Sequence, residues 1–263
     1  MIADFNKKEE EYRSELNKLI DICHDNLKRT RVAKEYVLGE RNLSKDAVLR
    51  NRIGFFPRNI GKLTDHVSAE WLKLSGLMDY DGSSQYSNYY SIIFPIYDDY
   101  GEAIAISART MLSTEEREVL GIPKYKNSKF SKAQNLFGLH LAKESILREQ
   151  QVFVVEGNLD QISMFDAGIT NTVACCGTGF SRQHLIKLAR YTDKVTVMLD
   201  NDETGRNSTE GIYNKYLSCG INFRFAKLPD EYHDAGEYFL DNGKTMRDFR
   251  KDLTEVTFNG DWV

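Results

Sequence analysis

The stretch that decides the fold begins at residue 152 and reads Val152-Phe153-Val154-Val155-Glu156-Gly157-Asn158-Leu159-Asp160. Its four leading apolar residues predict a short buried strand, and Gly157 predicts a tight turn into a helix over about 159–166. Glu156 therefore stands at the carboxyl end of that strand. In parallel sheets covered by helices, functional side chains collect at this end of the strands.

The same alternation of strand, turn and helix continues along the second half of the chain. We expect strands over 152–155, 172–176, 194–199 and 221–228, with helices over about 159–166, 181–191 and 204–217. Strands that alternate with helices over short connections predict an α/β fold, here a four-stranded, mainly parallel sheet with flanking helices.

Acidic residues stand where these strands end. Asp200 and Asp202 follow the third strand, as Glu156 follows the first, and Asp234 or Glu237 follows the fourth. Carboxylate oxygens that converge at one sheet edge suit Mg²⁺ or Mn²⁺. Neither His nor Cys accompanies the acids at the first and third strand ends, so zinc is not expected. The alternative is that Asp200 and Asp202 only cap the helix that follows them.

The first half of the chain has a mixed pattern. Apolar residues at spacings of three and four predict a helix over 6–37, and Ser44 is a suitable cap for another helix. Residues 92–97 and 103–108 predict the two strands of a hairpin, and 113–123 looks like a polar insertion. This half is therefore expected to be a mixed α+β subdomain.

Charge is distributed unevenly over the 263 residues. The whole chain carries 35 Lys and Arg against 39 Asp and Glu, a net charge of −4, but residues 27–62 hold ten basic and three acidic residues. A second basic group follows at Lys124, Lys126, Lys129 and Lys132. Local basic clusters on an acidic chain indicate a track for a polyanion, although a solvated helix face gives the same pattern.

Composition excludes several classes of protein. A hydrophobic fraction of 41 % is typical of a globular chain of one or two domains. No apolar run approaches the roughly 20 residues of a membrane span, and the first residues do not read as a signal peptide. The four cysteines form no C-x2-C pair, which speaks against a zinc ribbon and favours a reducing, cytoplasmic location.

Together the motifs resemble a known family. Residues 154–160 followed by 199–205 resemble the Toprim signature, and the first half resembles the amino-terminal subdomain of bacterial DnaG-type DNA primases. The segments that carry the second likeness are 33–39, 43–44, 53–55, 93–96, 107–109, 124–128 and 137–139. The resemblance implies a Toprim domain preceded by a basic primase subdomain, and we expect domains over 1–125 and 126–245 with a short extension over 246–263.

A primase core implies synthesis of short RNA primers on single-stranded DNA by divalent-metal-dependent nucleotidyl transfer. By position, Glu156, Asp200 and Asp202 are its catalytic acids, holding two or more Mg²⁺ or Mn²⁺ ions, with Asp234 as a further ligand. Whether Glu156 is a ligand or a general base stays open. The expected contacts to nucleotide or template are Arg109, Lys124, Tyr125, Asn127 and Lys132.

The family's Asp-Pro-Asp after the fourth strand is incomplete here, and its zinc module and helicase-binding domain are missing. The chain is therefore expected to be a compact viral or plasmid primase, or an excised core. Expected partners are single-stranded DNA, ribonucleoside triphosphates, a replicative helicase and a separate zinc-module protein. The resemblance suggests a monomer in a bacterial cytoplasm.

Two other functions remain open from the sequence: a Toprim nuclease using the same acids, and a non-catalytic primase-like accessory that binds DNA. Tyr86, Tyr89 and Tyr90 flank a predicted strand. They are candidates for stacking on template bases, or else for packing in the core.

Overall fold

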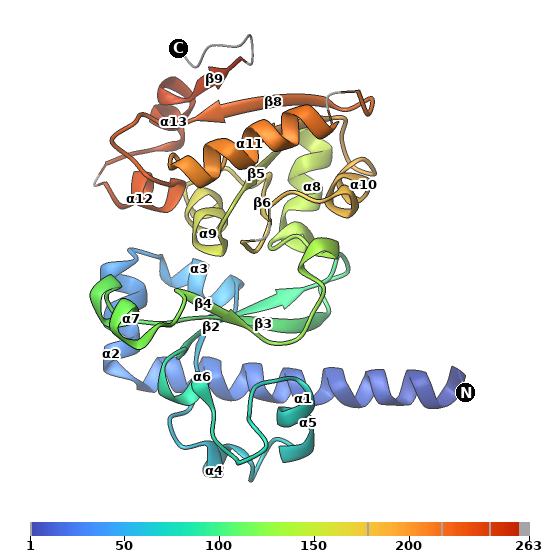
Figure 1. The fold of residues 1–263 in the computed structure, drawn as a ribbon, viewed down its shortest axis with the longest axis vertical. Helices are drawn as coiled ribbons and strands as arrows, with labels where there is room; N and C mark the ends of the chain where they lie inside the picture. The colour runs from blue at the N-terminus through green and yellow to red at the C-terminus, as the bar shows by residue number, and fades with distance from the viewer. Residues whose placement is uncertain (1, 178, 217, 242, 258–263) are drawn as a thin grey trace. The chain divides into compact units, whose positions relative to one another are not determined.

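The structure is a computed structural model that describes residues 2–177, 179–216, 218–241 and 243–257 (Figure 1). The chain divides into two compact units, Met1–Tyr97 with Glu102–Phe130 and Asp98–Gly101 with Ser131–Val263. The division into domains over 1–125 and 126–245 with an extension over 246–263 stays a prediction.

The first unit contains a four-stranded antiparallel sheet in the order β1-β2-β3-β4. Its strands are β1 (Gly54–Phe55), β2 (Ile92–Tyr97), β3 (Ala103–Arg109) and β4 (Tyr125–Asn127). The predicted hairpin is confirmed, because β2 and β3 pair along their length, with Ile93 opposite Ala108. The tip of this hairpin, 98–101, belongs to the second unit, where Asp99 pairs with Lys187.

A long helix packs on this sheet through its apolar face. The helices of the unit are α1 (Ile2–Arg29), α2 (Arg31–Lys34), α3 (Lys45–Arg50), α4 (Ile60–Leu63), α5 (Ala69–Leu74), α6 (Gln85–Asn88) and α7 (Thr114–Leu120). Leu19, Ile20 and Cys23 of α1 are fully buried. Gly54 of β1 lies so close that a Cβ there would stand 2.7 Å from the Cβ of Cys23, so only glycine lets this strand approach the helix.

The prediction of one continuous helix over 6–37 is wrong. The helix breaks at Thr30, which is extended and whose hydroxyl donates to the carbonyl of Asn26. A π-helix, η1 (Glu35–Glu40), follows α2. Such wide turns often accompany functional residues, because they shift the side chains by one position. The segment 113–123, expected as a polar insertion, contains α7 with a capping box at Ser113.

The second unit is built on a five-stranded sheet in the order β6-β5-β7-β8-β9. The strands are β5 (Val152–Val155), β6 (Thr172–Ala174), β7 (Lys194–Val197), β8 (Asn222–Lys227) and β9 (Thr254–Val256). The first four are parallel to one another, which confirms the predicted fold class. The sheet has one strand more than expected, since β9 pairs antiparallel with β8. Three residues with two exposed side chains carry no periodic signal that predicts a strand.

Helices flank this sheet and bury its apolar side chains. They are η2, a short 3-10 helix (Lys132–Gln134), α8 (Leu139–Glu149), α9 (Asn158–Asp166), α10 (Arg182–Leu188), α11 (Glu203–Tyr216), α12 (Ala235–Leu240) and α13 (Met246–Asp252). In Figure 1, α11 runs alongside β8. Its Ile212 and Tyr216 join Phe225 of β8 in the hydrophobic core.

The residues after 245 also pack into this unit. Phe249 of α13 is 1 % exposed and meets Phe153 of β5 edge to face, with ring centroids 5.8 Å apart. Part of the expected extension, 258–263, and the expected last residue of the helix over 204–217 lie outside the described residues.

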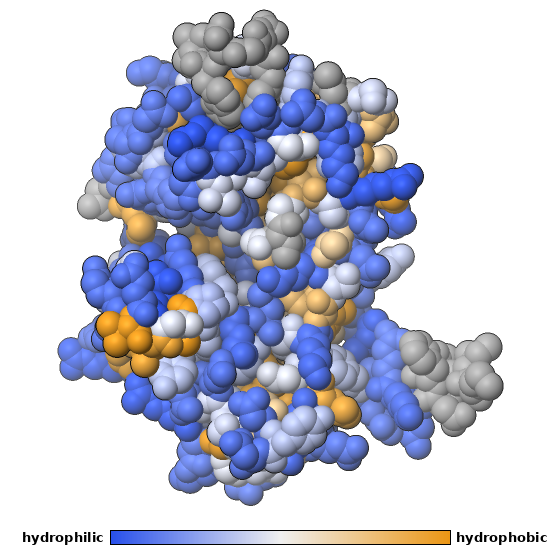
Figure 2. Space-filling model, viewed as in Figure 1, coloured by the Kyte–Doolittle hydropathy of each residue, from blue (hydrophilic) through white to orange (hydrophobic). Residues whose placement is uncertain are grey.

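Most of the visible surface is hydrophilic (Figure 2). An apolar patch lies over α7, where Val119 and Leu120 are exposed. Among the described residues, no helix combines the length and the apolar character needed to cross a membrane.

Candidate metal and nucleotide site

Three adjacent parallel strands bring their carboxyl ends to one edge of the second unit's sheet. Glu156 follows β5, Asp200 follows β7, and Asp234 follows β8 and caps α12. Because β5, β7 and β8 are neighbours in the sheet order, these acids gather from separate segments of sequence.

Asp200 is the centre of this acidic group. Its side chain is 23 % exposed. The pKa of Asp200 is raised to about 8, first by burial and then by the negative charges of Asp160, Glu156, Asp234 and Asp202, in that order of effect. The structure therefore brings the predicted acids within electrostatic reach of one another. Carboxylates held together in this way favour a bound cation.

The helix-capping alternative applies to Asp202 but not to Asp200. The backbone N–H of Gly205 donates to Oδ1 of Asp202 at 2.7 Å, which is a cap on α11. The side chain of Asp200 instead faces His233. A Cβ on Gly205 would lie 2.0 Å from the backbone oxygen of Asp200, so glycine is required for α11 to start this close to the acid.

Asp160 is a site residue that the sequence reasoning did not select. It is buried, and its two carboxylate oxygens accept from two separate segments: Oδ2 from the N–H of Gly157 and Oδ1 from the N–H of Gly236, both at 3.0 Å. Asp160 thus ties the turn that carries Glu156 to the start of α12. The signal was in the opening motif, where an aspartate stands four residues after the glutamate.

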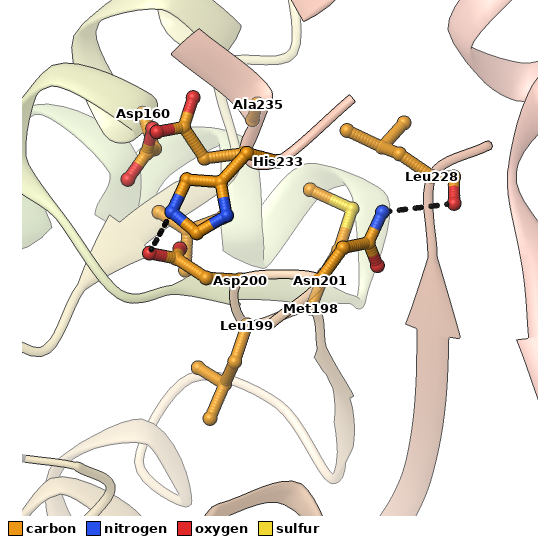
Figure 3. A pocket seen from close by; sticks show the side chains of 10 residues that line it. Asp160, Met198, Leu199, Asp200, Asn201, Leu228, His233 and Ala235 are labelled. Carbon is orange, nitrogen blue, oxygen red and sulfur yellow. Dashed lines mark hydrogen bonds and ion pairs between the residues drawn. The ribbon is translucent and has the colours of Figure 1, made fainter. Parts of the chain in front are cut away.

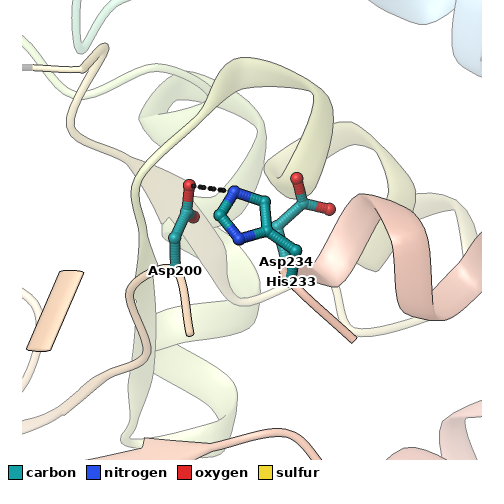
Figure 4. Close-up of side chains that lie close together, drawn as sticks. All are labelled: Asp200, His233 and Asp234. Carbon is teal, nitrogen blue, oxygen red and sulfur yellow. Dashed lines mark ion pairs between the residues drawn. The ribbon is translucent and has the colours of Figure 1, made fainter. Parts of the chain in front are cut away.

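His233 is the second residue that was missed. Its Nε2 lies 3.5 Å from Oδ2 of Asp200. One ligand atom each from Asp200, His233 and Asp234 lie within 4.8 Å of one another (Figure 4). The argument against zinc considered only the first and third strand ends, whereas His233 stands after the fourth strand.

These residues line a shallow pocket (Figure 3). One wall is a loop fixed by Asn201, which stands between Asp200 and Asp202 in the sequence. Its side-chain amide donates to the carbonyls of Leu228 and Tyr232, at 3.1 and 2.7 Å. The loop after β8 is therefore held beside the carboxyl end of β7.

Two of the residues predicted to contact nucleotide or template, Arg109 and Tyr125, meet on the sheet of the first unit. Arg109 at the end of β3 stands opposite Tyr125 of β4. It is 5 % exposed, and its guanidinium donates to two hydroxyls, from Nη1 to Tyr125 and from Nε to Tyr36, each at 2.7 Å. Arg41 also donates from Nε to the Tyr36 hydroxyl, at 3.1 Å. Tyr36, which lies in η1, was missed although the segment 33–39 was singled out.

Of the other predicted contacts, two lie on either side of Tyr125 along the chain and one lies in the other unit. Lys124 is exposed just before β4, and Lys132 is half-buried in η2 of the second unit. Asn127 at the end of β4 is half-buried, and its Oδ1 is a buried oxygen without a hydrogen-bond partner in the described part of the chain. The stacking hypothesis is wrong for Tyr86 and Tyr90, which are each 1 % exposed and pack in the core.

Family comparisons agree with this geometry in both units. A Toprim-like family model matches residues 153–239, and a model of the N-terminal domain of the DNA primase catalytic core matches residues 22–143. The chain belongs to the DnaG-type primase family. Its two matched segments correspond to the two halves on which the sequence resemblance rests.

Individual primases show the same relationship. The DNA primase of Aquifex aeolicus is 29 % identical over 248 residues, which cover 90 % of this chain and 48 % of that protein. A crystal structure of the zinc-binding and RNA polymerase domains of the Aquifex aeolicus primase matches with a TM-score of 0.81 at 27 % identity, covering 95 % of this chain and 62 % of that one.

A DnaG primase catalytic domain bound to single-stranded DNA matches with a TM-score of 0.75 at 26 % identity, covering 94 % of this chain and 81 % of that one. The chain spans about half or less of the length of the curated primases it matches first.

Proposed function

We propose that this chain is the catalytic core of a DNA primase, which joins ribonucleotides into short RNA primers on a single-stranded DNA template. The observation that carries the proposal is the group of acids around Asp200, at the carboxyl edge of a sheet in a chain of the primase family. The match to a primase catalytic domain bound to single-stranded DNA supports this template.

A divalent cation fits the acids around Asp200 by the chemistry of the donors. A carboxylate whose pKa is raised to about 8 by burial and by neighbouring negative charge is costly to ionise without a cation. We assign Asp200, Asp202 and Asp234 as ligands of Mg²⁺ or Mn²⁺, with two or more ions at the site, and Glu156 as a further ligand or a general base. When bound, such ions polarise phosphate oxygens and offset the charge of the leaving pyrophosphate.

The basic residues of the first unit serve the nucleotide and the template in this proposal. Lys124 is exposed and suited to neutralise phosphate charge. Arg109 is buried and its guanidinium plane is fixed by two tyrosine hydroxyls, so it holds the half-buried Tyr125 in a set position. We assign both, with Asn127 and Lys132, to contacts with nucleotide or template. The basic stretch 27–62 follows the template phosphates.

The remaining expectations rest on the resemblance alone. A helicase partner, a separate zinc-module protein, a monomeric state, a cytoplasmic location and a viral or plasmid origin stay predictions.

The test is incorporation of labelled ribonucleotides on single-stranded DNA by the full chain with Mg²⁺ or Mn²⁺. We expect short RNA products, and we expect Asp200→Asn to reduce their yield by at least about 100-fold, because catalytic metal ligands contribute several kcal/mol to the transition state. The matched control is Asp193→Asn, which removes an exposed carboxylate just before the amino end of β7.

Products that persist at the same level in Asp200→Asn contradict the proposal. Shortened template indicates the nuclease instead, and binding without any product indicates the accessory.

A further inference from the structure

The backbone of His233 is held by hydrogen bonds at both its N–H and its carbonyl. The N–H of His233 donates to Oε2 of Glu237 at 2.7 Å, and its carbonyl accepts from the N–H of Asn201 at 2.8 Å. Asn201 is the residue next to Asp200, so this second bond ties the histidine directly to the segment that carries the acid. The backbone of His233 is thereby placed before any ligand binds.

The imidazole of His233 points at the acids. Its Nε2 is 3.5 Å from Asp200, and Figure 4 shows the ring beside the carboxylates of Asp200 and Asp234. Opposite ligands of an octahedral ion with bonds of about 2.1 Å lie about 4.2 Å apart. The three ligand atoms lie within 4.8 Å of one another, so small rotations of side chains bring them onto one ion.

The imidazole changes which cation suits the site. Mg²⁺ prefers oxygen ligands and keeps much of its water, whereas imidazole nitrogen suits first-row transition metals. The side chain of His233 is 46 % exposed and the pocket is open to solvent, so an ion can reach the nitrogen without unfolding.

We propose that His233 is a nitrogen ligand of the divalent cation at Asp200, and that it makes this site select Mn²⁺ over Mg²⁺. The proposal rests on the proposed function only in requiring that a cation binds at Asp200.

The experiment measures binding of Mn²⁺ alone and of Mg²⁺ alone to the full chain by titration calorimetry, with electron spin-echo spectroscopy of the Mn²⁺ form. In the wild type we expect a ¹⁴N coupling from directly bound imidazole. His233→Ala should remove that coupling and weaken Mn²⁺ binding by at least about tenfold, which is the lower end of the effect seen when residues that support a metal ligand are replaced. The affinity for Mg²⁺ should change by less than about threefold.

Two further variants sharpen the result. His233→Asp replaces the nitrogen by carboxylate oxygen, so it also loses the ¹⁴N coupling but binds Mg²⁺ more tightly than His233→Ala does. His66→Ala removes an exposed imidazole from the first unit and leaves both affinities and the coupling as in the wild type. Thermal unfolding of each variant confirms that it is folded.

A bound Mn²⁺ without ¹⁴N coupling, or equal weakening of both ions in His233→Ala, overturns the role of His233 and leaves the proposed function intact. If neither ion binds, or if Asp200→Asn binds both as the wild type does, the cation site at Asp200 itself fails, and the primase proposal loses its basis as well.

Discussion

At the scale of single residues, Asp200 shows how the fold places a carboxylate where its negative charge is unfavourable. Its carboxylate is mostly buried and four other carboxylates act on it. A protein that kept such a cluster only for stability would lose free energy by it, since like charges at short range repel. The cost in free energy of ionising Asp200 therefore supports the proposed cation site.

From the raised pKa of Asp200 we predict how the free energy of unfolding depends on pH when no metal is present. An unfolded chain releases the Asp200 proton near its ordinary pKa of 3.8, whereas the folded chain keeps it until about pH 8. Between these values the folded state binds more protons, so the contribution of Asp200 to the free energy of unfolding falls as the pH rises. Asp200→Asn abolishes this loss, and we expect it to unfold at a higher temperature than the wild type at pH 8.5 in EDTA.

The gain should be at least about 2–4 °C, which corresponds to about 1 kcal/mol for a chain of this size, and should vanish at pH 4.5. Scanning calorimetry at the two pH values measures it, with Asp193→Asn as the variant that should show no such pH-dependent gain. A stabilisation of Asp200→Asn that is the same at both pH values contradicts the argument.

At the scale of elements, the positions of the acids depend on hydrogen bonds between turns as well as on the strands. Asp160 lies in α9 and joins the turn after β5 to the start of α12 through its two oxygens. Glu156 and Asp234 are each next to one of the joined segments. The spacing of these two acids is therefore set by a residue that has both oxygens engaged by backbone groups.

Asp160→Asn should separate this joining role from the charge. The amide offers one acceptor oxygen where the carboxylate offers two, so one of the two part-buried N–H groups loses its partner. Such a loss costs about 1–3 kcal/mol, which urea unfolding of the full chain measures. We also expect weaker Mn²⁺ binding by calorimetry. Unchanged stability together with unchanged Mn²⁺ binding would show that α12 is placed by other contacts.

The same scale explains what sequence can and cannot predict here. Strands β5 to β8 were predictable, because apolar runs bounded by glycine and acids carry a local signal. Glu156, Asp200 and Asp202 were predictable as a group, since parallel strands end at one edge. His233 was not selected, because its proximity to Asp200 depends on a loop path fixed by Asn201. The role of Asp160 was missed because it depends on its contact with Gly236, which is 76 residues away in the sequence.

The sequence also left undecided which aromatic and basic side chains are buried. Tyr86 and Tyr90 stand in a polar, serine-rich segment, yet both are buried. Tyr86 packs against Phe56 and against Tyr90, with the Tyr86 and Tyr90 ring centroids 6.4 Å apart. Arg109 likewise reads as a surface cation, but the pairing of β3 with β4 and the turn of η1 enclose it between two tyrosines. In both cases tertiary packing decides, and no local pattern reports it.

At the scale of the whole molecule, a basic stretch and the acidic group lie in different units. The chain is acidic overall, yet residues 27–62 hold ten basic residues against three acidic ones, and the acidic group around Asp200 lies in the other unit. Some of these cations are engaged in surface ion pairs, such as Lys28 with Asp25 and Arg31 with Glu35. Ion pairs of this exposed kind are weak and leave phosphate binding accessible.

Salt dependence of DNA binding tests the template role of this stretch. Each phosphate contact on single-stranded DNA contributes about −0.7 to the slope of log K against log salt. Lys45 and Arg58 are exposed, so the double variant Lys45→Gln/Arg58→Gln should reduce the steepness of the slope by about 1.4 if both contact phosphates. Fluorescence anisotropy with an oligothymidine at several salt concentrations measures the slope. Lys8→Gln, which changes an exposed lysine of α1 outside the stretch, should leave it unchanged. If the double variant keeps the wild-type slope, the basic stretch is a solvated surface and the template runs elsewhere.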